Sequence, residues 1–140
     1  YPSLCYFEAT NVSLGRGTDK PFQQFGHPNM KGYDYSFTPE SREGAKNPPQ
    51  LGNKCFGRDL SGMSDDEIIA KQLDLSYLIE AYRSVNEGVK FFTSFFEKLI
   101  GVDWVRTMIE EGMSAEEISQ RWKPDVEKFK QQSRKYLLYK

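Results

Sequence analysis

The side chains best suited to chemistry lie together near the start of the chain, within residues 6–22. Glu8 carries a carboxylate, and Arg16 carries a guanidinium between Gly15 and Gly17. The same stretch offers the hydroxyl and amide groups of Thr10, Asn11, Ser13 and Thr18. A guanidinium presents a planar fork of donors that suits a carboxylate or a sugar oxygen, and flanking glycines let the backbone take positive φ and approach a ligand closely. The segment is therefore a candidate site for a small polar ligand.

A loop without any ligand can have the same composition. Gly-Arg-Gly is common in ordinary turns, and polar residues are what any loop needs. Glu8 and Arg16 could equally form an ion pair that only shapes the loop. The segment lacks the G-x-x-x-x-G-K-[S/T] spacing of a P-loop and the third glycine of a dinucleotide fingerprint. The residue pattern alone leaves a binding site and a structural loop both open.

The elements expected to position this segment are short strands. Residues 4–7 are apolar and aromatic, which predicts a buried strand that ends where the polar segment begins. In residues 23–54, frequent Gly and Pro exclude long helices. Tyr33, Tyr35 and Phe37 alternate with polar residues, so we expect a short strand whose aromatic face either lines a sugar site or packs in the core. Residues 55–60 are another strand candidate.

From residue 64 onward the pattern becomes helical. Ser64 with Glu67, and Ser114 with Glu117, have the spacing of capping boxes. Further helix boundaries are expected at Asp74 and Asp103 as N-caps, Gly101 and Gly112 as ends, and Pro124 as the first residue of the last helix. The expected core residues of this half are Leu75, Leu78, Ile79 and Tyr82, and the cluster Phe91, Phe92, Phe95, Phe96, Leu99 and Ile100. The predicted fold class is α+β, with short mixed β-strands in the N-terminal half packed with a cluster of α-helices in the C-terminal half.

Length and composition set further bounds. A chain of 140 residues has the size of one domain, 1–140, with a core of its own. The net charge of −1 gives no electrostatic reason to expect nucleic acid as a partner, and no apolar run approaches the roughly 20 residues that span a bilayer. Two cysteines, Cys5 and Cys55, and one histidine do not suggest a metal site. The cysteines are expected to be buried free thiols, or a disulfide if the protein is exported.

The opening of the chain resembles a known signature. Residues 2–22 read P-S-L-C-Y-F-E-A-T-N-V-S-L-G-R-G-T-D-K-P-F. They are similar to the P-S-L-x-x-F-E-G-T-N-V-S-x-G-R-G-T-x-x-P-F signature of the NamZ/YbbC-like exo-β-N-acetylmuramidases. The resemblance continues at residues 26–28, 37–39, 53–57, 96–103, 112–118 and 136–139. It covers essentially the whole chain, but only as the C-terminal portion of that family, whose members carry a larger N-terminal Rossmann-like domain that we expect to be absent here.

The resemblance implies hydrolysis of a β-glycosidic bond that releases N-acetylmuramic acid from the non-reducing ends of peptidoglycan fragments. It implies no cofactor, a bacterial protein exported to the periplasm or the cell exterior, and a muropeptide or peptidoglycan disaccharide as partner. Glu8 would then be a catalytic or substrate-orienting carboxylate, and Arg16 would bind the lactyl carboxylate of the substrate. The other substrate-binding candidates are Thr10, Asn11, Thr18 and His27, of which the two threonines and Asn11 could instead hold the loop. The alternative is a non-catalytic domain that binds peptidoglycan sugar or serves as a structural accessory.

Two departures from the family pattern affect these expectations. Ala9 stands where the family usually has glycine, which matters only if that position needs positive φ. His27 stands where alanine is common. The family's second domain is the larger concern, because a cleft between two domains is incomplete with one of them absent. We therefore expect little or no activity from this chain by itself.

Overall fold

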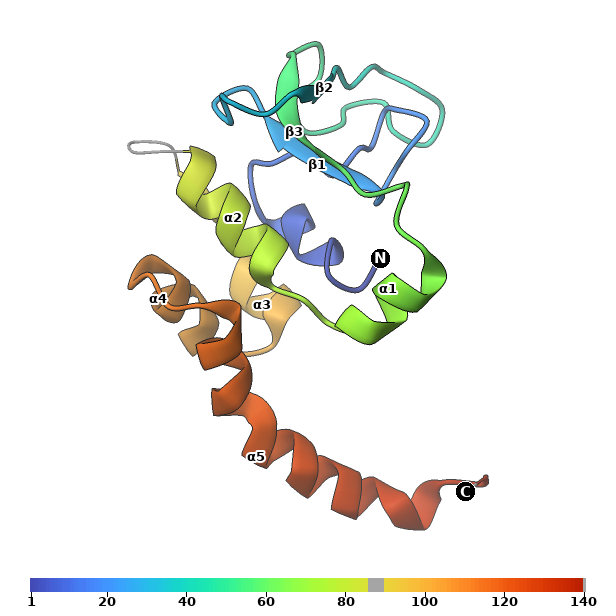
Figure 1. Ribbon diagram of the computed structural model, residues 1–140, viewed down its shortest axis with the longest axis vertical. Helices are drawn as coiled ribbons and strands as arrows, with labels where there is room; N and C mark the ends of the chain where they lie inside the picture. The colour runs from blue at the N-terminus through green and yellow to red at the C-terminus, as the bar shows by residue number, and fades with distance from the viewer. Residues whose placement is uncertain (86–89, 140) are drawn as a thin grey trace.

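The computed structural model describes residues 1–85 and 90–139 (Figure 1). A three-stranded sheet forms in the N-terminal half from β1 (Gln24–His27), β2 (Tyr35–Phe37) and β3 (Cys55–Asp59). The helices of the second half are α1 (Asp65–Lys71), α2 (Ser76–Val85), α3 (Phe96–Ile100), α4 (Trp104–Glu110) and α5 (Ala115–Ser133). Short 3-10 helices, η1 (Cys5–Ala9) and η2 (Arg134–Tyr136), lie near the two ends. The α+β prediction is confirmed.

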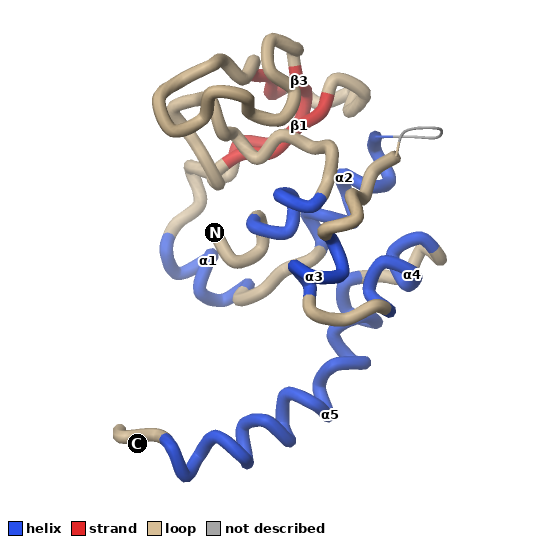
Figure 2. Tube along the Cα trace, turned by 180° about the vertical axis from the view of Figure 1, so that it is seen from behind, coloured by secondary structure: helices blue, strands red, loops and turns tan. Residues whose placement is uncertain are grey.

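The sheet is antiparallel, with β3 between β1 and β2. Figure 2 shows that the strands are short and are joined by long loops. Gly26 of β1 pairs with Gly57 of β3, and a Cβ on Gly57 would lie only 2.0 Å from the Phe25 carbonyl oxygen. Both strands predicted after residue 23 are confirmed, although β2 begins at Tyr35. β1 was not predicted, since its four residues, all buried, have no alternation of polar and apolar side chains.

The strand predicted for residues 4–7 is wrong, because the chain forms the 3-10 helix η1 there. The Phe7 amide bonds the Leu4 carbonyl, and the Thr10 amide bonds the Phe7 carbonyl, which is the i to i+3 pattern of a 3-10 turn. This turn places Leu4 and Phe7 on one side, where both are buried. A short apolar run has no period that separates a buried strand from a buried helical turn.

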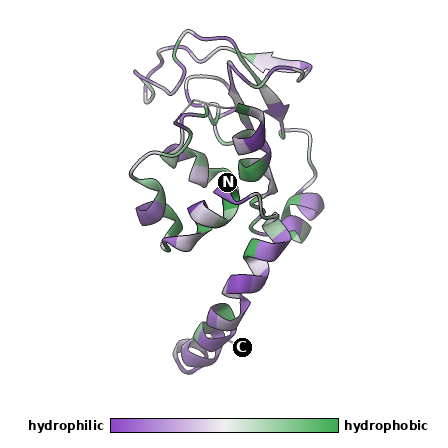
Figure 3. Ribbon diagram, turned by 90° about the vertical axis from the view of Figure 1, so that its left-hand side faces the viewer, coloured by the Kyte–Doolittle hydropathy of each residue, from purple (hydrophilic) through white to green (hydrophobic). Residues whose placement is uncertain are grey.

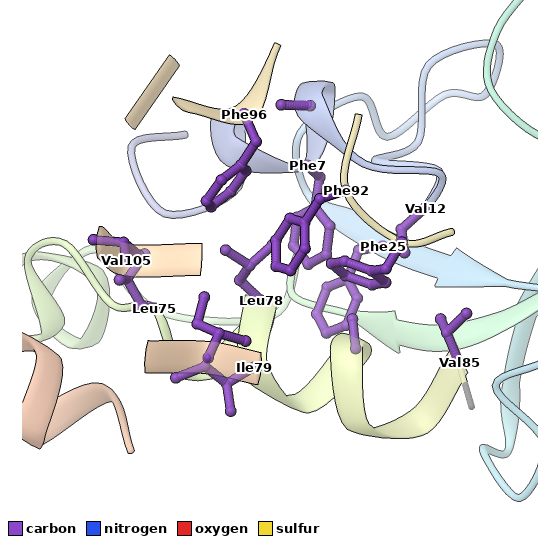
Figure 4. Packing of buried hydrophobic residues seen from close by; sticks show 14 of the residues in the cluster. Phe7, Val12, Phe25, Leu75, Leu78, Ile79, Val85, Phe92, Phe96 and Val105 are labelled. Carbon is purple, nitrogen blue, oxygen red and sulfur yellow. The ribbon is translucent and has the colours of Figure 1, made fainter. Parts of the chain in front are cut away.

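A cluster of buried apolar side chains joins η1, the sheet and the helices α2 to α4 (Figure 4). Phe7 of η1 stacks on Phe25 of β1, with ring centroids 5.0 Å apart, and Phe92 packs against Phe96 at 4.4 Å. Burying one such side chain contributes about 1.5–3 kcal/mol. The expected core residues of α2 lie in or against this cluster. Phe95, expected among them, is instead exposed.

Most of the predicted helix boundaries are confirmed. Ser64 and Ser114 both form complete capping boxes with the glutamates three residues later. The Asp74 carboxylate accepts a hydrogen bond from the Ser76 amide at the start of α2. Gly101 and Gly112 follow α3 and α4 with φ of +81° and +84°.

Two predicted boundaries need correction. Asp103 precedes α4, but its side chain makes no capping hydrogen bond within the described residues. Pro124 does not open the last helix, because the capping box at Ser114 starts α5 earlier and the helix continues through the proline. Proline lacks the amide that would bond the Gln120 carbonyl, so α5 loses one hydrogen bond there and is expected to bend. Figure 1 shows α5 changing direction along its length.

Two further expectations concerned the state of the cysteines and the presence of a membrane-spanning segment. Cys5 and Cys55 are free thiols, and Cys55 is buried as expected, whereas Cys5 is only half-buried. Burial raises the pKa of Cys55 to about 12. In the described residues, no helix is both long and apolar enough to span a membrane.

Candidate functional site

Glu8 and Arg16, the two charged residues of the signature segment, are in direct contact. Glu8 lies in η1, and the loop that follows returns so that Arg16 Nη2 donates to Glu8 Oε1 at 2.6 Å. The side chains are 31% and 40% exposed, respectively. The sequence thus places a carboxylate and a guanidinium together on a surface that a ligand can reach.

The glycines around Arg16 are required by the fold of the loop. Gly15 and Gly17 have φ of +84° and +79°, a region that side chains with a Cβ rarely adopt. A Cβ would also lie 2.4 Å from a backbone carbonyl oxygen in each case, that of Lys20 for Gly15 and that of Glu40 for Gly17. The positive φ expected at these glycines is confirmed. The groups that approach them closely belong to the chain itself.

Phe22 supports Arg16 and was not singled out from the sequence. The Arg16 guanidinium lies over the Phe22 ring, 4.9 Å from its centroid, and the Tyr1 ring packs against the same phenylalanine at 4.7 Å. Phe22 has φ of +59°, which is uncommon for a bulky residue and costs about 1–2 kcal/mol. The bond from its amide to the Leu14 carbonyl holds this conformation. Backbone strain of this kind often occurs at functional sites.

A cleft of about 290 Å³ lies next to this aromatic support. Its walls come from the N-terminal residues, from the end of β3 and from α1, and include Tyr1, Phe22, Leu60, Ile68, Lys71 and Tyr77. Phe22 lines the cleft and also lies under Arg16, whereas Glu8 and Arg16 themselves are not among the lining residues. The arrangement offers an aromatic and apolar wall with charged groups at its edge, which is the general character of a ligand site.

The two threonines of the segment use their hydroxyls within the loop. Thr10 Oγ1 donates to the Phe7 carbonyl and accepts from the Val12 amide. Thr18 Oγ1 donates to the Gly15 carbonyl at 2.7 Å and accepts from Gln24 Nε2 at 2.6 Å. Both hydroxyls therefore have hydrogen-bond partners within the chain. Both hold the backbone on which Glu8 and Arg16 are presented.

Asn11 and His27 also face inward. The Asn11 backbone bonds the Phe91 carbonyl and the Gln50 side chain, and its Oδ1 is buried without a partner in the described part of the chain. His27 lies in β1, buried, with Nδ1 accepting from the Asn29 amide. Burial lowers the pKa of His27, so the imidazole is neutral at pH 7. Ala9 is not among the residues with positive φ, so its Cβ brings no strain.

A second ion pair fixes the end of the segment to the sheet. Lys20 Nζ donates to Asp59 of β3. Burial alone would raise the pKa of Asp59, but hydrogen bonds from Lys20 and Ser61 hold that pKa at about 2. Tyr35, one of the alternating aromatics, donates its hydroxyl to Gln24, and Tyr33 donates to Glu80 of α2. The Tyr35 hydroxyl therefore joins β2 to β1, and the Tyr33 hydroxyl joins the residues before β2 to α2.

Metal binding finds no support in the described residues. No group of three or more His, Cys, Asp and Glu side chains converges within 1–85 and 90–139 as metal ligands would. The charged groups of this region are Glu8 and Arg16 in their ion pair, and Asp65 and Lys71 in the wall of the cleft.

Comparison with known proteins agrees with the sequence resemblance. The family model described as "Exo-beta-N-acetylmuramidase NamZ, C-terminal" matches residues 1–139. The peptidoglycan beta-N-acetylmuramidase NamZ of Bacillus subtilis (strain 168) is 32% identical over 151 residues, covering 99% of this chain and 36% of the relative. A crystal structure of a DUF1343 family protein from Bacteroides fragilis NCTC 9343 covers 100% of this chain and 40% of its own chain, at 61% identity and a TM-score of 0.96.

These matches fix the family and the region within it. The chain spans less than half the length of either relative, and the matching model describes a C-terminal region. This chain therefore belongs to the NamZ exo-β-N-acetylmuramidase family and corresponds to the C-terminal region of its members.

Proposed function

We propose that this chain forms the C-terminal part of a glycoside hydrolase that releases N-acetylmuramic acid from the non-reducing ends of peptidoglycan fragments. The chain would contribute substrate-binding or catalytic residues to a cleft that a preceding domain completes. The observation that carries the proposal is the half-exposed Glu8–Arg16 pair, supported by Phe22 at the edge of the cleft. Family membership supplies the reaction class. Peptidoglycan lies outside the cytoplasmic membrane, so the protein would act in the periplasm or outside the cell.

Arg16 is the proposed contact for the lactyl carboxylate of N-acetylmuramic acid. A guanidinium has five N–H donors, and Glu8 takes one on Nη2. The others can form a bidentate bond to a second carboxylate, a geometry that lysine cannot reproduce. The Phe22 ring beneath the guanidinium limits its motion, which reduces the entropy lost on binding.

Glu8 is the proposed carboxylate of this half of the site. Glycoside hydrolysis usually needs two carboxyl groups, one that protonates the leaving oxygen and one that faces the oxocarbenium-like transition state or activates water. A carboxylate that already accepts from Arg16 is suited to the second task, or to accepting bonds from sugar hydroxyls. The acid would then come from the preceding domain. Thr10, Asn11, Thr18 and His27 would act by holding the loop and the adjoining strand in shape.

The alternative is a domain that binds peptidoglycan sugar without taking part in the chemistry. The Glu8–Arg16 contact favours it, because a carboxylate held in an ion pair can also serve only to orient Arg16. The two functions differ in what Glu8 does. A catalytic carboxylate changes the rate of the chemical step, whereas an orienting one changes substrate affinity.

The test is hydrolysis of a chromogenic β-glycoside of N-acetylmuramic acid by the protein that carries the preceding domain. We expect Glu8→Gln to lower kcat by about 100-fold or more, the usual range for loss of a catalytic acid or base. Glu110→Gln, at the exposed end of α4, is the matched control and should retain full activity. The isolated chain should release little or no product. An unchanged kcat in Glu8→Gln would exclude a catalytic role, and a raised KM alone would favour the binding domain.

A further inference from the structure

Helix α5 extends away from the rest of the molecule as an arm (Figure 1). Ile118, in its first turn, is buried in the core, and it is the only buried residue among Ala115–Ser133. The rest of α5 and η2 is exposed or half-buried. Figure 3 shows that α5 is predominantly hydrophilic, so its apolar side chains stand out by their positions.

Those apolar side chains share one face. Trp122, Val126 and Phe129 follow Ile118 at intervals of four, four and three residues, which keeps them on one side of a helix with 3.6 residues per turn. Tyr136 lies beyond α5, in η2. We call these four residues the arm face. Its exposure rises along the arm, from the half-buried Trp122 to 41% for Val126, 68% for Phe129 and 74% for Tyr136. The side of the helix that is buried at Ile118 is thus exposed to solvent further along the arm.

The arm face joins a concave surface that reaches the N-terminus. A hollow of about 700 Å³ lies between residues 71–75 and α5, with Leu73, Trp122 and Val126 among its lining residues. Lys71 and Gln72 line both this hollow and the cleft beside Tyr1. The cleft and the hollow therefore adjoin at Lys71 and Gln72, and together they make up the surface between Tyr1 and the arm.

We propose that this surface, with the arm face at its far end, is the docking site for the domain that precedes this region in members of the family. The matched region is C-terminal and leaves more than half of each relative outside the match, so the remaining domain is joined through the Tyr1 side. Tyr1 lies on the rim of the same concave surface. A tethered domain is also present at high effective concentration, which favours it over a second copy of the chain. Contiguous exposed apolar side chains of this kind mark protein interfaces.

Hydrogen exchange tests the docking directly. We compare the amides of residues 122–136 in this chain alone and in the protein with the preceding domain attached. We expect at least tenfold slower exchange when the domain is attached, because its surface would exclude water from the arm face. Equal exchange in the two proteins would overturn the proposal. Protection of the isolated chain that grows with concentration, together with a dimer in light scattering, would assign the arm face to a second copy instead.

A pair of matched variants identifies the face that docks. Phe129→Asp places a charge on the arm face, and Gln131→Asp places the same charge on the opposite side of the same turn, at an exposed position. In the two-domain protein we expect Phe129→Asp to restore fast exchange and trypsin cleavage after Lys128 and Lys130, with Gln131→Asp unchanged. Equal effects of the two variants would contradict the assignment. Phe129 is exposed in this chain, so its replacement leaves the core intact, which thermal unfolding of the variants checks.

The proposal depends on a preceding domain being present, as the proposed function does, but it does not depend on the reaction. Exchange and proteolysis report docking without any substrate. A protected arm in a protein without muramidase activity would support the docking surface and reject the proposed function. An active protein whose arm exchanges freely would support the proposed function and reject the docking surface.

Discussion

Arg16 is held in place by neighbours whose first role is in the fold. Gly15 and Gly17 have positive φ, and backbone carbonyls of the same chain occupy the space where their Cβ atoms would lie. The sequence suggested that glycine allows a ligand to come close. In the structure, the atoms that lie close to these glycines belong to the chain itself. The loop turns sharply and presents Arg16 toward Glu8. The pair is therefore displayed by a tightly constrained loop.

Replacing Gly17 by alanine measures this constraint. Gly17 and Gly44 both have φ of +79°, but a Cβ on Gly17 meets the Glu40 carbonyl at 2.4 Å, whereas a Cβ on Gly44 meets no heavy atom within 4 Å. We expect Gly44→Ala to cost about 1–2 kcal/mol in the free energy of unfolding, the usual cost of left-handed backbone. Gly17→Ala should cost clearly more. Urea denaturation compares the two, and equal costs would show that the loop relaxes around the added methyl group.

The Lys20–Asp59 pair predicts a pH dependence of stability. Hydrogen bonds from Lys20 and Ser61 hold the pKa of Asp59 at about 2 against its ordinary value of 3.8. Because the folded pKa lies below the unfolded one, this stabilisation is fully present above about pH 4 and is lost as pH falls toward 2. Asp59→Asn should therefore flatten the decline of unfolding free energy between pH 4 and pH 2. Parallel curves for the two proteins would mean that other carboxylates cause the decline.

The contact between Glu8 and Arg16 could be predicted from the sequence, but the residues that hold the two side chains in place could not. Glu8 and Arg16 stand out by residue type and spacing, and an ion pair was one of the two interpretations of that pattern. Phe22 carries no such signal, because the bond from its amide to the Leu14 carbonyl holds its positive φ, and its contacts with Arg16 and Tyr1 arise only in the folded chain. The inward hydroxyls of Thr10 and Thr18 could not be told from ligand-facing ones by residue type alone.

At the scale of elements, helix ends were predicted best. Capping boxes and helix-ending glycines are local signals, and those at Ser64, Ser114, Gly101 and Gly112 are all found in the structure. Elements decided by tertiary contacts were missed. Residues 4–7 form a 3-10 turn because two side chains are buried on one side, and β1 exists because it pairs with β3. Neither cause can be read from a four-residue stretch.

Pro124 gives a prediction for α5. Proline in a helix interior is about 3 kcal/mol less favourable than alanine, since it removes one hydrogen bond and crowds the preceding turn. Pro124→Ala should restore the bond to the Gln120 carbonyl and slow hydrogen exchange at residues 121–128 of this chain, with little change in the unfolding of the body. Asp125→Ala, next to it in the sequence, is the control and should have a much smaller effect. Equal exchange in both variants would mean that the proline does not weaken the helix.

At the scale of the whole molecule, the two hollowed surfaces lie next to each other. The cleft that Phe22 lines and the hollow beneath α5 share the lining residues Lys71 and Gln72. A domain docked on the arm face would therefore also lie beside the cleft. This placement joins the proposed function to the proposed interface, and it explains why little activity is expected from the chain alone.

The most direct test of the account is calorimetric titration of N-acetylmuramic acid into the two-domain protein and into its Arg16→Met variant. Lys20→Met is the matched control, because Lys20 also forms an ion pair and its side chain is similarly exposed, at 41% against 40% for Arg16. Loss of a hydrogen bond to a charged group costs about 1.5–3 kcal/mol, so we predict roughly 10- to 100-fold weaker binding in Arg16→Met and little change in Lys20→Met. N-acetylglucosamine, which lacks the lactyl carboxylate, should bind both variants like the parent. Equal affinity of the parent and Arg16→Met for N-acetylmuramic acid would contradict the placement of the substrate at the Glu8–Arg16 pair.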